Sequence, residues 1–69
     1  MVELEYLITY ARDGSTTRES SIVFTGNIYK TLEGMKRPGV KLRNVIVSII
    51  DRDPVFPDTM HFVEHFAEL

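Results

Sequence analysis

A run of mostly β-branched residues over positions 44–50 is the sequence feature that most constrains the fold. Such side chains fit a pleated surface, so the run predicts a strand. Val45, Val47 and Ile49 share one side of this strand and two isoleucines share the other, so both faces need cover. A chain of 69 residues without cysteine has little material for that cover and no disulfide to stabilise it, so we expect self-association.

The segments before this run predict a β-hairpin. Residues 2–11 alternate apolar and polar side chains, an Asp-Gly pair at 13–14 marks a tight turn, and residues 17–24 form the returning strand. A two-residue turn would separate Ile22 and Phe24 from the apolar face of the first strand. We favour a three-residue loop, because it gathers those two side chains on that face.

Two further segments predict helices. Residues 28–35 carry apolar side chains at helical spacing and are followed by a Pro-Gly pair that ends a helix. Two prolines within residues 51–57 prevent the third strand from continuing. Asp58 can then cap a final helix over residues 58–69. The apolar side of that helix consists of Phe62, Val63, Phe66 and Leu69.

The order of these elements predicts one domain over residues 1–69, of the α+β class. It is a small two-layer β-β-α-β-α unit with a three-stranded, mainly antiparallel sheet. If the third strand lies beside the first, it becomes a long apolar edge, which the C-terminal helix or a second copy of the chain would cover. The residues expected in this hydrophobic or homodimer interface are Val45, Val47, Ile49, Phe62 and Phe66.

His61, Glu64 and His65 spell H-x-x-E-H, which resembles the inverted motif of zinc peptidases. On a helix the two histidines would lie one turn apart on the same side. We interpret the motif as the polar side of the C-terminal helix, and we expect no metal and no cofactor. The sequence also has no nucleophile elbow and no phosphate-binding glycine loop, so we expect no catalytic residues and no enzyme activity.

Four of the eight basic residues lie in one short stretch and form a candidate nucleic-acid-binding site: Lys36, Arg37, Lys41 and Arg43. A basic cluster of this kind attracts a phosphate backbone. However, no aromatic residue is interleaved with the cluster to stack on bases, and the formal net charge of the chain is -2. Nucleic-acid binding is therefore the alternative function.

The stretch Arg18-Glu19-Ser20 offers a different candidate surface. Glu19 and Ser20 are similar to the Glu-Ser-Ile strand of bacteriophage inhibitors of uracil-DNA glycosylase, although Ser21 stands where that family has isoleucine. In that family the strand docks in the DNA groove of the enzyme and imitates backbone phosphates. The β-β-α-β order of a short, cysteine-free chain also resembles another small phage inhibitor of the same enzyme. The resemblance implies a protein partner bound through Arg18, Glu19 and Ser20.

These observations predict a non-enzymatic protein-binding module that forms a homodimer. The specific expectation is a phage or mobile-element inhibitor or regulator of a host enzyme or defence complex. No apolar run approaches the roughly 20 residues of a membrane-spanning helix, so we expect no membrane partner. We expect a cytoplasmic location, which is the host cytoplasm if a phage encodes the chain. The sequence does not identify the partner.

Overall fold

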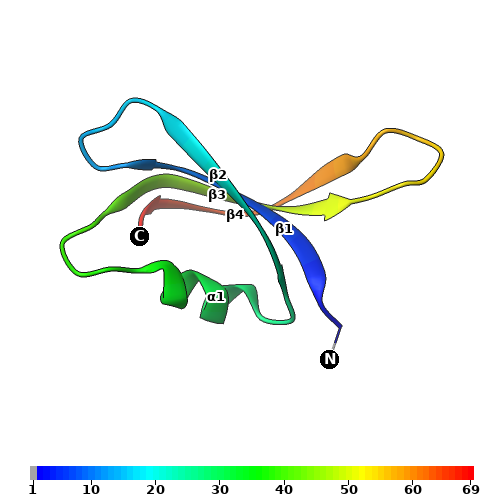
Figure 1. Ribbon diagram of the computed structural model, residues 1–69, viewed down its shortest axis with the longest axis horizontal. Coiled ribbons are helices and arrows are strands. Elements are labelled where there is room, and N and C mark those ends of the chain that lie inside the picture. The colour runs from blue at the N-terminus through cyan, green and yellow to red at the C-terminus, as the bar shows by residue number, and fades with distance from the viewer. Residues whose placement is uncertain (1) are drawn as a thin grey trace.

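The computed structural model describes residues 2–69, which form four strands and one helix (Figure 1). Their bounds are β1 Leu4–Arg12, β2 Arg18–Thr25, α1 Ile28–Met35, β3 Leu42–Asp51 and β4 Thr59–Glu68. The strands build one antiparallel sheet in the order β2-β1-β3-β4. Strand β1 therefore lies between its antiparallel neighbours β2 and β3.

The predicted three-stranded β-β-α-β-α unit is wrong, because the C-terminal segment is the strand β4 and not a helix. Strand β4 pairs antiparallel with β3 from Asp51↔Thr59 to Arg43↔Glu68. A strand satisfies the backbone N–H and C=O groups along the edge of β3, which a helix packed on its side chains cannot do. A helix of about three turns would also be marginal alone. Pairing with β3 therefore determines the structure of this segment, although its apolar residues recur at helical spacing.

A β-bulge in β4 explains why its apolar residues recur at helical spacing. The register shifts between Val47 and Ser48, which pair with Glu64 and Phe62, so Val63 is the extra residue. An extra residue moves the side chains beyond it to the other face. Phe62 and Phe66, four positions apart, therefore lie on opposite faces of the sheet.

Helix α1 covers one face of the sheet (Figure 1). Its N-cap is Asn27, whose side-chain oxygen accepts a hydrogen bond from the backbone N–H of Lys30 at 3.2 Å, and its C-terminus is followed by a turn in which Gly39 has a φ of 76°. The helix has only eight residues and persists by burying Ile28 and Leu32 against the sheet. The core under it consists of Tyr6, Ile8, Tyr10, Ile28, Leu32, Leu42, Val45 and Val47.

The predicted three-residue hairpin loop is wrong. The last paired residues are Ala11 and Arg18, so residues 12–17 connect the strands and Leu7 pairs with Ile22. The loop is held from outside the hairpin, because the Asp13 N–H donates to the carbonyl of Lys41 at 3.0 Å. This longer loop shifts the register and sends Ile22 and its neighbour Phe24 to the face opposite α1.

Helix α1 is the one helix among residues 2–69. In this described part of the chain, no helix has the length and apolar character needed to cross a membrane.

Candidate functional site

The face of the sheet opposite α1 carries the largest set of exposed apolar side chains, and we call it the open face. A row across all four strands passes through its centre, formed by the pairs Ile22↔Leu7, Leu7↔Ser48 and Ser48↔Phe62. Ser48 is the only polar residue of this row. The large apolar residues on the open face are Leu7, Ile22, Phe24, Ile46, Ile50, Met60 and Phe62, of which Ile50 is buried.

Most of these side chains are accessible to solvent. Phe24 and Phe62 are each 67% exposed, Met60 is 59% exposed and Ile22 is 54% exposed. Val55, in the loop between β3 and β4, is 79% exposed. Monomeric proteins rarely leave a contiguous apolar patch of this kind uncovered, so the open face is a candidate binding surface.

The two hairpins give the open face its shape. Figure 1 shows both hairpin tips curving away from α1, one at each end of the long axis, while the strands cross one another in the middle. Such a strong twist makes a sheet saddle-shaped. The open face is therefore twisted and not flat.

At the end of the open face near the β3–β4 hairpin, charged groups are paired within the chain. Arg52 donates to both carboxylate oxygens of Glu5, at 2.7 and 2.8 Å, and to Asp58 Oδ2 at 2.8 Å. Hydrogen bonding and the charge of Arg52 lower the pKa of Glu5, and the same carboxylate raises the pKa of Arg52. The cluster combines one positive and two negative charges, so this end of the open face carries one net negative charge.

The predicted partner-binding residues divide between the two faces. Arg18 lies over the other end of the open face, where its guanidinium donates to Thr9 Oγ1 at 3.0 Å and to the carbonyl of Asn44 at 2.8 Å. Ser20 pairs with Thr9 and shares the open face. Glu19 points to the other side, where its carboxylate forms an ion pair with Arg12. The structure therefore brings Arg18 and Ser20 together but separates Glu19 from them.

The residues predicted for a homodimer interface are dispersed as well. Val45 and Val47 are 0% and 1% exposed and belong to the chain's own core, and Ile49 packs against it. Phe66 also packs on this core beneath α1, so Phe62 alone of the five lies on the open face. The sequence reasoning missed the other exposed residues of that face because it placed Ile22 and Phe24 on the wrong side. Their alternation within residues 17–24 was the available signal, but it needs the correct register.

Local partners hold all four residues of the basic segment. Lys36 forms an ion pair with Glu33 at 3.1 Å, Lys41 with Glu68 at 2.9 Å, and Arg43 with Asp13 at 3.3 Å. Arg37 instead donates to the backbone carbonyls of Gly34 and Lys36. The pair with Lys41 lowers the pKa of Glu68, and Glu68 raises the pKa of Lys41. Three acidic side chains therefore reduce the positive potential of this segment.

The two histidines do not converge. His61 pairs with Ile49, which packs on the core side, whereas His65 pairs with Ile46 on the open face. Because these positions lie on opposite faces of a strand, the two rings cannot share one metal ion. Within residues 2–69, no group of three or more His, Cys, Asp or Glu side chains is placed to hold a metal.

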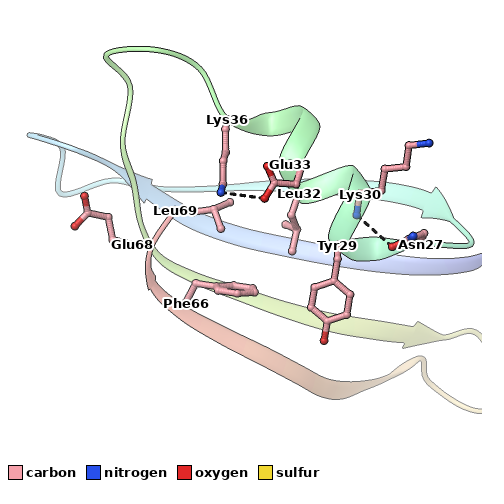
Figure 2. Close-up of a pocket in the computed structure, with 9 residues that line it drawn as sticks. All are labelled: Asn27, Tyr29, Lys30, Leu32, Glu33, Lys36, Phe66, Glu68 and Leu69. Atoms are coloured by element: carbon pink, nitrogen blue, oxygen red, sulfur yellow. Dashed lines mark hydrogen bonds and ion pairs between the residues drawn. The ribbon is translucent and has the colours of Figure 1, made fainter.

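A groove of about 420 Å³ lies between α1 and the C-terminal part of β4 (Figure 2). Its apolar lining comes from Tyr29, Leu32, Phe66 and Leu69, and the Lys36–Glu33 ion pair lies at its rim. Beside it, Glu64 raises the pKa of the Tyr29 phenol through hydrogen bonding and charge. One carboxylate oxygen of Glu64, Oε2, is buried and has no hydrogen-bond partner among the described residues.

Comparison of the chain with models of protein families, with curated proteins and with solved structures gave no significant match.

Proposed function

We propose that the protein is a non-enzymatic protein-binding module and that the open face is its binding surface. The observation that carries this proposal is the row Ile22–Leu7–Ser48–Phe62, which presents apolar side chains from three strands around a single hydroxyl. Interface cores elsewhere are depleted in charge and enriched in aromatic residues and methionine. The open face has the same composition, with Phe24 and Met60 beside the row.

Burial of the apolar side chains of the open face would stabilise a complex. Fully burying a Phe, Ile or Met side chain contributes ~1.5–3 kcal/mol, and such residues dominate binding when they sit at the centre of an interface. Phe24 and Phe62 each retain two thirds of their exposure, so most of this contribution is still available to a partner.

The charge distribution favours a protein partner over a nucleic acid. Lys36, Lys41 and Arg43 already have acidic partners, and a phosphate backbone would have to compete with them. The open face offers no cluster of free cations in its central row, which a nucleic-acid surface requires.

The finer prediction, a phage or mobile-element inhibitor of a host enzyme or defence complex acting in the cytoplasm, remains a proposal. The similarity of Glu19 and Ser20 to an inhibitor strand supports it, and the absence of cysteine fits a reducing compartment. For Glu19 to imitate a phosphate, its ion pair with Arg12 would first have to open.

The test compares two double variants as baits for protein partners in a cell extract. Phe24→Glu with Phe62→Glu places charges on the open face, and we expect it to lose the proteins that the wild-type chain retains. Val2→Glu with Val40→Glu is the matched control, because it alters two exposed apolar residues outside that face and should retain them. Equal retention by both variants would refute the open face as the binding surface.

A further inference from the structure

The size of the open face limits what can cover it. Its strands have 8 to 10 residues. With a rise of ~3.3 Å per residue and ~4.8 Å between strands, a four-stranded face measures roughly 30 by 19 Å. When two faces of that size pack together, they bury on the order of 1,200 Å² in total, including the uneven surface of their side chains. This area is near the lower end of stable interfaces.

The two ends of the open face carry opposite net charges, whereas its centre is uncharged. Arg52 faces the two carboxylates of Glu5 and Asp58 at one end, and Arg18 donates to neutral oxygens at the other and keeps its positive charge. A partner charged with one sign throughout would match only one of these ends. A second copy of the chain presents the same uncharged centre. In a two-fold symmetric contact the same surface of both copies meets, so these two centres would lie against each other.

The fold leaves this face as the one large surface without a second layer. Helix α1 covers the opposite face, and its eight residues already bury the core beneath it. A chain of this size buries only about 60% of its unfolded surface and gains much from a second core. The saddle shape also suits a copy, because two twisted sheets fit together when one is rotated against the other.

We propose that the partner on the open face is a second copy of this chain, so that two four-stranded sheets pack face to face and each α1 lies on the outside. This inference rests on the proposed function, because it names the partner of the same surface. The row through Ser48 lies at the centre of the contact, with Phe24 and Phe62 as its main apolar anchors.

Sedimentation of the purified chain tests the oligomeric state. We expect twice the 7.9 kDa chain mass at tens of micromolar and dissociation on dilution. Phe24→Glu with Phe62→Glu should shift the protein to monomer with an unchanged circular dichroism spectrum, whereas Val2→Glu with Val40→Glu should remain dimeric. A wild-type chain that stays monomeric at millimolar concentration would overturn the inference.

Thiol labelling locates the contact without large substitutions. The chain has no cysteine, so Ser48→Cys introduces a single thiol at the centre of the open face. Its maleimide labelling rate should fall at least tenfold as the protein concentration rises through the dimerisation range. The rate of Lys30→Cys, on α1, should not change. A dimer in which Ser48→Cys labels at the monomer rate would place the contact elsewhere and refute the inference.

The two proposals fail in different ways. A monomer whose bait experiment still depends on Phe24 and Phe62 refutes the second copy but keeps the open face as a binding surface. A monomer whose bait experiment is insensitive to both residues refutes the proposed function as well.

Discussion

The two faces of the sheet are built from the same strands and differ in what covers them. On the face under α1, Ile8, Val45 and Val47 are at most 1% exposed. On the open face, Phe24 and Phe62 are both 67% exposed although they are larger and as apolar. The comparison shows that apolar residues of the same strands are buried beneath α1 on one face and exposed on the other, and the exposed face is the proposed binding surface.

The largest expected effect comes from the covered face. Ile8→Ala leaves a cavity in the centre of the core, which typically costs ~2–5 kcal/mol. Since a small domain has a net stability of only ~5 kcal/mol, we expect the variant to lose about half of its stability or more and to unfold at a much lower urea concentration than the wild type at 25 °C. Urea denaturation followed by circular dichroism measures this loss. A variant as stable as the wild type would show that the core does not hold the fold.

Two phenylalanines of β4 test the difference between the two faces of the sheet within one strand. Phe66→Ala removes a ring that packs on the core, and we expect the free energy of unfolding to fall by ~1–3 kcal/mol at any protein concentration. Phe62→Ala removes an exposed ring, so its effect should appear only at concentrations where the dimer forms. Denaturation at about 1 µM, where we expect the monomer, and at about 100 µM, where we expect the dimer, distinguishes the two effects. Equal behaviour of both variants would contradict the assignment of the two rings to opposite faces.

A pH titration tests the ion pair at the end of the open face. Hydrogen bonding to Arg52 lowers the pKa of Glu5 from its ordinary 4.5 in the folded state. The pair therefore stabilises the fold above about pH 4.5, and this stabilisation is lost as the pH falls through the lower pKa of the folded protein. We expect the melting temperature of Glu5→Gln to depend less on pH below 4.5 than that of the wild type. Glu3→Gln, which changes the charge equally, should keep the wild-type dependence.

The smallest effect is expected for the histidines. His61 and His65 lie on opposite faces of β4, so replacing both with glutamine should change the stability by less than about 0.5 kcal/mol. Zinc should not raise the melting temperature of the wild type more than that of the variant. A stoichiometric zinc ion that survives dialysis of the wild type would contradict this.

The sequence predicted the elements that local chemistry decides. The β-branched run around Val47 forms β3, and the segment between Asn27 and the Pro-Gly turn forms α1. The sequence did not predict the C-terminal strand, because the spacing of Phe62 and Phe66 is helical. The bulge that produces this spacing depends on pairing with β3.

The candidate surface was less predictable than the fold. Its residues are visible in the sequence, but which face each occupies depends on the register of β2 against β1. That register follows from the loop over residues 12–17 and from the contact of Asp13 with Lys41, which is distant in sequence. Side-chain alternation identifies two faces and cannot say which face α1 will cover.

The length of this hairpin loop has an evolutionary consequence. Insertions and deletions are tolerated best in exposed loops, and the loss of one residue between Ala11 and Arg18 would invert every side chain of β2. Ile22 and Phe24 would then turn toward α1 and Ser21 and Val23 toward the open face. The deletion of a single codon would thus remove Ile22 and Phe24 from the proposed binding surface without replacing either residue.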